Sequence, residues 1–129
     1  MGFKIHQIAD SQGFEYLPSS AITPEIGKAL VLDGGTLKVA TGTTKPTYIC
    51  ACHKDSAVKE GDVIPVIRVR DDMIFETTSS AALTSVSAGS KVTISTDGMQ
   101  VTATTTDGVA EIVSIEDRTV GGKVHVRFS

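Results

Sequence analysis

Alternating apolar and polar residues dominate the chain from Ala29 onward. Short apolar or alternating runs recur there at intervals of roughly 8 to 14 residues, and clusters of Gly, Asp and Lys separate them. A period of two places successive side chains on opposite faces of a strand, and turn residues at this spacing are typical of a β-barrel or β-sandwich. The pattern therefore predicts a small, single-domain all-β fold over residues 29–129, with little helix.

The C-terminal third carries the most regular alternation. An Asp97-Gly98 pair separates its first two runs, and such a pair supplies the positive φ values that a two-residue hairpin turn requires. Asp107-Gly108 and Gly121-Gly122 precede two further runs. We expect a four-strand antiparallel meander, built from residues 92–96, 99–104, 109–116 and 124–128.

The middle of the chain predicts four or five further strands. A hairpin is expected around Asp33-Gly34-Gly35, and the apolar run Tyr48–Cys52 is typical of a strand buried on both faces. Pro65 should push the next strand, over 63–70, toward a sheet edge or a bulge, because proline cannot donate a ladder hydrogen bond. The run 73–78 predicts another strand, and residues 79–90 predict a loop or a single turn of helix.

The first 28 residues have no sustained period of 2 or 3.6. We interpret residues 1–28 as an irregular N-terminal arm on the β domain of 29–129, with a single helical turn over 23–27, and we expect a domain without residues 1–17 to stay folded. Exposed large apolar side chains are costly, so those of the arm must pack either on their own domain or on a partner, and both remain open. These candidate partner-binding residues are Phe3, Ile5, Ile8, Phe14, Tyr16 and Leu17.

Composition and charge exclude several classes of protein. The chain has 16 Thr, 14 Val and 11 Ile against 5 Leu, which favours strands. Its 12 basic and 15 acidic residues give a net charge of -3, so we expect no nucleic-acid partner. No apolar run approaches the roughly 20 residues of a membrane helix, and the start lacks a signal-peptide core, so neither secretion nor a membrane partner is expected.

The most tempting chemical motif is Cys50-Ala51-Cys52-His53. Zinc sites commonly separate two Cys by two to four residues, whereas only Ala51 separates Cys50 from Cys52. The chain has no second Cys pair, and His6 and His125 are its only other imidazoles. We therefore expect two free, buried thiols and a solvated His125 on a sheet face. A nucleophilic Cys-His pair is not expected, because neither Cys lies in a Gly-rich turn. The pairs of adjacent acidic residues lie in predicted turns, so they are not expected to act in acid-base catalysis. We therefore predict that the protein is not an enzyme and has no catalytic, cofactor-binding or metal-binding residues.

Three segments of the first half carry a family resemblance. The segment 22–33, with Leu30-Val31-Leu32-Asp33 at its end, is followed by 37–44, with Gly42-Thr43-Thr44, and by the small-residue apolar run 48–52. Together they resemble the lambda-type head-decoration, or capsid cement, proteins of tailed phages. The chain departs from that pattern in having no Trp and a longer C-terminal region, 90–129.

The resemblance implies a structural virion protein that is made in the host cytoplasm and lies on the outer capsid surface. Such proteins are usually homotrimers that clamp neighbouring major capsid subunits and stabilise the icosahedral shell. The arm residues named above would then contact the major capsid protein.

Two other classes of function stay open at this stage. A virion or surface β-domain could bind carbohydrate or a host protein through exposed aromatic residues, for which Tyr16, Tyr48 and Phe75 are the candidates. A small enzyme or metal protein would have to be built on Cys50, Cys52 and His53.

Overall fold

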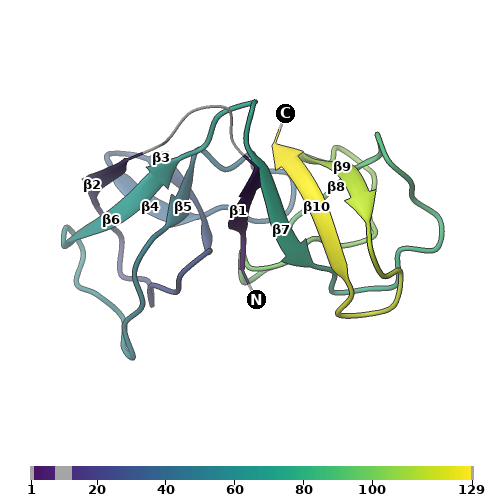
Figure 1. The fold of residues 1–129 in the computed structure, drawn as a ribbon. Coiled ribbons are helices and arrows are strands. Elements are labelled where there is room, and N and C mark those ends of the chain that lie inside the picture. Colours follow the sequence, from purple (N-terminus) through teal and green to yellow (C-terminus); the bar gives the residue numbers. More distant parts are fainter. Residues whose placement is uncertain (1, 8–12, 129) are drawn as a thin grey trace.

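The computed structural model describes residues 2–7 and 13–128, which form two antiparallel five-stranded sheets and no helix (Figure 1). Sheet A has the order β1-β7-β10-β9-β8, sheet B has the order β2-β6-β5-β3-β4, and neither closes into a barrel. The predicted all-β fold is confirmed, and of the two architectures expected it is the two-sheet sandwich and not the barrel. The strands are β1 (Lys4–Gln7), β2 (Phe14–Pro18), β3 (Ala29–Asp33), β4 (Thr36–Val39), β5 (Tyr48–Cys50), β6 (Val63–Arg68), β7 (Ile74–Thr78), β8 (Lys91–Val92), β9 (Ala110–Ile115) and β10 (Lys123–Phe128).

The hairpin of β3 and β4 confirms the prediction from Asp33-Gly34-Gly35. Gly34 and Gly35 both have positive φ, 61° and 88°, which is the conformation that a two-residue turn between right-twisted strands demands. β5 pairs with β3 on its other edge and is shorter than the predicted 48–52 strand.

The expectation that Pro65 would place its strand at an edge is wrong, since β6 lies between β2 and β5. The Ala51 amide donates to the Pro65 carbonyl at 3.0 Å, one residue beyond the end of β5. The missing amide proton of Pro65 therefore faces the place where β5 stops, so little pairing is lost. β2 adds to the opposite edge of β6, where the Glu15 carboxylate accepts two hydrogen bonds from the Arg68 guanidinium, at 2.8 and 3.0 Å.

The predicted meander is correct only in its last hairpin, β9 with β10. Residues 93–95 and 100–104 do exchange backbone hydrogen bonds, but β8 pairs with β9 and not with the 99–104 run. The chain leaves sheet A after Val92 because Ile94 bonds with Gly42 of the loop after β4. β8 can lie against β9 because Gly108 has no side chain, and a Cβ there would come within 2.3 Å of the Lys91 carbonyl.

The N-terminal 28 residues contain two regular strands that their aperiodic sequence did not predict. β1 is the edge strand of sheet A, with a register shift between Ile5 and Gln7, and β2 is the edge strand of sheet B. The expected helical turn at 23–27 is a β-turn, in which the Lys28 amide donates to the Glu25 carbonyl and Gly27 has a φ of 91°. The predicted loop at 79–90 is present.

The main core lies between the sheets and is centred on three aromatic rings. Phe3 contacts Phe128 at a centroid distance of 5.2 Å, and Phe128 contacts Phe75 at 5.4 Å. A second, smaller core covers the other face of sheet B, where Leu30 and Val66 pack beneath the loop residue Val58. β5 is thus buried on both faces, as its apolar run predicted, whereas β6 alternates buried residues with exposed or partly exposed ones.

Candidate functional site

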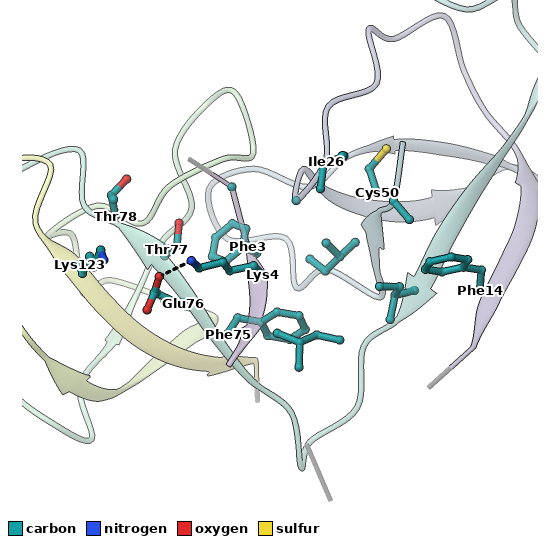
Figure 2. Close-up of a pocket in the computed structure, with 16 residues that line it drawn as sticks. Phe3, Lys4, Phe14, Ile26, Cys50, Phe75, Glu76, Thr77, Thr78 and Lys123 are labelled. Carbon is teal, nitrogen blue, oxygen red and sulfur yellow. Dashed lines mark ion pairs between the residues drawn. The ribbon is translucent and has the colours of Figure 1, made fainter. Parts of the chain in front are cut away.

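An apolar groove of about 530 Å³ opens where the two sheets meet (Figure 2). Its bottom is formed by the buried side chains of Phe3, Phe75 and Ile49, and its rim by the exposed side chains of Phe14 and Ile26. Phe14 and Ile26 are 60% and 63% exposed, so most of their apolar surface contacts water. Exposed apolar side chains gathered around an apolar groove are typical of a surface that binds another molecule.

Local geometry explains how each rim residue comes to face outward. Phe14 and Tyr16 lie two residues apart on β2, so they project from the same face of that edge strand, and Tyr16 is 66% exposed. Ile26 immediately precedes Gly27 in the β-turn. The Gly27 carbonyl accepts from the Phe3 amide at 2.7 Å, and its amide donates to the Cys50 carbonyl at 2.9 Å. This double contact fixes the turn, and with it Ile26, between β1 and β5.

Charged groups line the side of the groove that sheet A contributes. The Lys4 ammonium lies 2.8 Å from Glu76 Oε2, and Lys123 lies on the same side of the groove (Figure 2). The hydrogen bond from Lys4 is the main reason that the pKa of Glu76 falls to about 2, and a hydrogen bond from His125 acts in the same direction. The groove therefore combines an apolar bottom with a charged border, as protein-binding surfaces commonly do.

The structure divides the six predicted partner-binding residues. Ile5, Phe14 and Tyr16 are exposed, and Leu17 is half-buried against the smaller core of sheet B. The prediction that Phe3 is an exposed partner-binding residue is wrong, because its ring is only 1% exposed and is part of the protein's own core. Ile8 lies outside the described residues.

Sequence reasoning missed Ile26 as an exposed apolar residue next to the groove. The available signal was its position directly before a turn glycine, where a side chain has no strand or helix to turn it inward. The sequence predicted a helical turn for this segment, which would have placed the Ile26 side chain differently.

The Cys50-Ala51-Cys52-His53 motif behaves largely as predicted. Both thiols are free; Cys50 is buried and Cys52 is only half-buried, just past the end of β5. Burial is the main reason that the pKa of the Cys50 thiol rises to about 11, which leaves it unreactive at neutral pH. His53 is exposed and pairs with Asp55 at 3.2 Å, and within the described part of the chain these residues belong to no group of converging metal donors.

The prediction that His125 is solvated is also wrong, because the residue is only 7% exposed. The His6 ring stacks on it at a centroid distance of 3.9 Å, and Glu76 and Ser114 contact its two ring nitrogens. The alternation around His125 correctly predicted the outer face of the sheet; it could not show that the His6 side chain, from β1, would stack over His125 on that face.

A scan against protein-family models finds no match for this chain, and a search of curated proteins finds no significant match. The described residues include no helix long and apolar enough to cross a membrane. We therefore base the functional proposal on the geometry of the molecule and on the sequence resemblance to capsid cement proteins.

Proposed function

We propose that this protein decorates the outer surface of an icosahedral phage capsid and stabilises it by binding neighbouring major capsid subunits. The observation that carries the proposal is the solvent-open groove with Phe14 and Ile26 on its rim. The resemblance to capsid cement proteins supplies the identity of the partner. Phe3 is not one of the exposed anchors, since its ring is internal and forms only part of the groove bottom.

The strands at the groove suit the capture of an extended segment of the major capsid protein. Both β1 and β2 are the outermost described strands of their sheets, so each presents backbone groups that a further strand could pair with. Main-chain pairing would give affinity, while Phe14, Tyr16 and Ile26 would act as apolar anchors. No catalytic chemistry is needed for such a role.

Multivalency lets weak single contacts stabilise a shell. In a homotrimer, three copies of the groove would bind three neighbouring capsid segments, and each binding event after the first would occur at a high effective concentration. A negative net charge suits an exposed, soluble exterior.

The test is co-sedimentation with expanded capsids assembled from candidate major capsid proteins. Phe14→Ala is expected to weaken capsid binding by roughly 30-fold, the usual effect of removing an aromatic anchor of about 2 kcal/mol. Val120→Ala is the matched control, because Val120 is an exposed apolar residue of the β9–β10 turn that does not line the groove. Equal occupancy for Phe14→Ala and the wild type, with capsids that the wild type does bind, would remove the groove from the proposal.

The alternative of a carbohydrate-binding or host-protein-binding domain loses two of its three candidate aromatics. Tyr48 and Phe75 are buried, and only Tyr16 remains exposed. The groove is lined mainly by apolar side chains, whereas a sugar site also needs polar groups for the hydroxyls, so the groove is better suited to a protein segment.

A further inference from the structure

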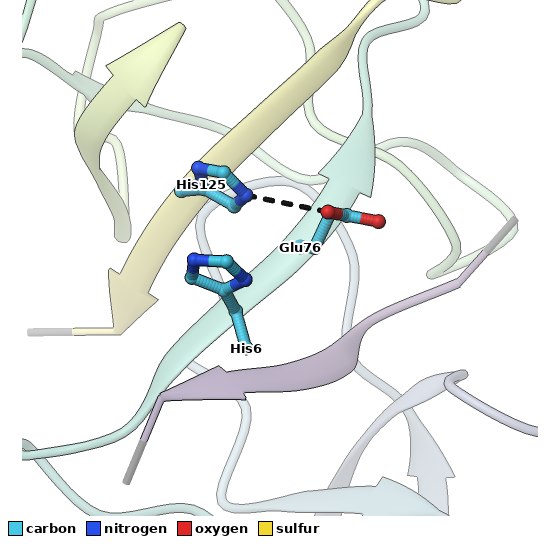
Figure 3. A group of neighbouring side chains, drawn as sticks. All are labelled: His6, Glu76 and His125. Carbon is cyan, nitrogen blue, oxygen red and sulfur yellow. Dashed lines mark hydrogen bonds and ion pairs between the residues drawn. The ribbon is translucent and has the colours of Figure 1, made fainter. Parts of the chain in front are cut away.

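Three adjacent strands place three metal-ligating side chains together on the outer face of sheet A (Figure 3). His6 comes from β1, Glu76 from β7 and His125 from β10, and Figure 3 shows both imidazoles lying beside the Glu76 carboxylate. One donor atom from each lies within 4.8 Å of the other two. His6 occupies the register shift of β1, between Ile5 and Gln7.

We propose that His6, Glu76 and His125 form a binding site for a divalent transition-metal ion of the Zn²⁺ class. Two imidazole nitrogens and one carboxylate oxygen are a donor set that Zn²⁺ takes in proteins, with water in the fourth position. Bonds of about 2.0 to 2.1 Å in a tetrahedron place ligand atoms about 3.3 Å apart, so the donors have to close by no more than about 1.5 Å. His6 is exposed on an edge strand, so its side chain has the freedom to make that movement.

Ser114 provides the outer contact that a metal-binding histidine usually has. Its hydroxyl oxygen lies 2.9 Å from His125 Nδ1, while His125 Nε2 lies 3.3 Å from Glu76 Oε1. In the metal-free protein Nε2–H donates to Glu76; in the metal-bound form the ring proton would lie on Nδ1 and be donated to Ser114, which leaves the Nε2 lone pair for the metal. The burial of His125 limits the side-chain entropy that metal binding would cost.

Lys4 competes with the metal for Glu76. Its ammonium lies 2.8 Å from Oε2, whereas Oε1 is the oxygen that faces His125. Lys123 and Arg127 flank His125 two residues away on β10 and add positive charge to the same face. Removing the Lys4 charge should therefore strengthen metal binding.

The site would link β1 to β10 across the intervening β7. A bound ion would hold β1, the edge strand that directly follows Phe3, in the sheet whose core contains Phe128. Metal binding to the folded state should therefore raise the melting temperature of the protein.

The experiment is a Zn²⁺ titration of the full-length protein, by calorimetry and by competition with a chromophoric chelator. We expect one ion per chain. His6→Ala and Glu76→Gln should each weaken Zn²⁺ binding at least 10-fold, Ser114→Ala should weaken it about 10-fold, and Lys4→Met should strengthen it severalfold. His53→Ala is the matched control, because His53 is the third histidine of the chain and is exposed outside the proposed site. The Zn²⁺ affinity of this variant should stay within about twofold of the wild-type value.

Folding is checked separately by circular dichroism without metal. His6 is the diagnostic position because it is exposed, whereas a His125 variant could fail through loss of packing. Zn²⁺ should raise the melting temperature of the wild type and of His53→Ala, but not of folded His6→Ala. The proposal is overturned if the wild type binds no Zn²⁺ at micromolar concentrations, or if His53→Ala loses as much affinity as His6→Ala. Neither result bears on capsid decoration, which is measured with a different partner.

Discussion

The aromatic residues near the N-terminus have two distinct environments, although they are similar in the sequence. Phe3 is buried against Phe128, whereas Phe14 lies on the groove rim with 60% of its surface in water. Both rings are equally hydrophobic; they differ in whether the local backbone directs the ring toward the space between the sheets.

This difference predicts opposite results for two Phe→Ala substitutions. Phe3→Ala should lower the free energy of unfolding by about 3 to 5 kcal/mol, since it leaves a cavity beside two other rings. Phe14→Ala should change it by no more than about 0.5 kcal/mol, because the ring is largely solvated already. Urea denaturation of both variants measures this, and a loss of similar size in the two would show that the groove rim is part of the core.

The two cysteines should differ in reactivity toward a thiol reagent. Burial raises the pKa of Cys50 to about 11, so at pH 8 only about one molecule in a thousand carries the Cys50 thiolate. Cys52 is half-buried and lies outside β5. We expect one fast and one slow phase of modification, with the fast phase absent from Cys52→Ala and the slow phase accelerating as the pH rises toward 11. A fast phase that survives in Cys52→Ala would contradict the buried environment of Cys50.

At the scale of strands, pairing in sheet A depends on a close backbone approach. β8 runs past Gly108, where a Cβ would come within 2.3 Å of the carbonyl carbon of Lys91. Backbone atoms cannot rotate away as a flexible side chain can, so Gly108→Ala should separate β8 from β9 and cost about 1 to 3 kcal/mol of stability.

The control for this substitution is Gly13→Ala, since no atom of the described residues lies within 4 Å of the Cβ position at Gly13. Its stability should stay within about 0.5 kcal/mol of the wild type. Thermal melts compare the two variants, and hydrogen exchange at Val92 and Ala110 reports directly on the β8–β9 pairing. Unchanged protection in Gly108→Ala would mean that β8 does not need this approach.

The elements that sequence predicts well are those whose pairing is local. Turn chemistry and alternation agree at Gly34-Gly35 and along β9 and β10, and these hairpins are present. β1 was missed because its partner is β7, about seventy residues away, and its four residues include a register shift that disrupts the period of two. The grouping of His6 with His125 depends on that same long-range pairing, so spacing along the chain could not have indicated it.

The whole molecule joins its two sheets through the N-terminal segment, which supplies an edge strand to each. Residues 4–7 extend sheet A and residues 14–18 extend sheet B, while Phe3 fills the core between them. This arrangement changes the expected result of an N-terminal deletion, because the segment that was interpreted as a dispensable arm contributes to both layers.

We therefore predict that deletion of residues 1–17 abolishes cooperative thermal unfolding, since it removes Phe3, β1 and nearly all of β2 and exposes the apolar surface of Phe75 and Phe128 to water. Loss of capsid binding by that truncation would then report unfolding and nothing about docking. The informative variant is Phe14→Glu combined with Ile26→Glu, which places charges on the groove rim and leaves the core intact. It should melt near the wild-type temperature and no longer sediment with capsids. A truncated chain that still melts cooperatively would show that the two edge strands are additions to an independently stable domain.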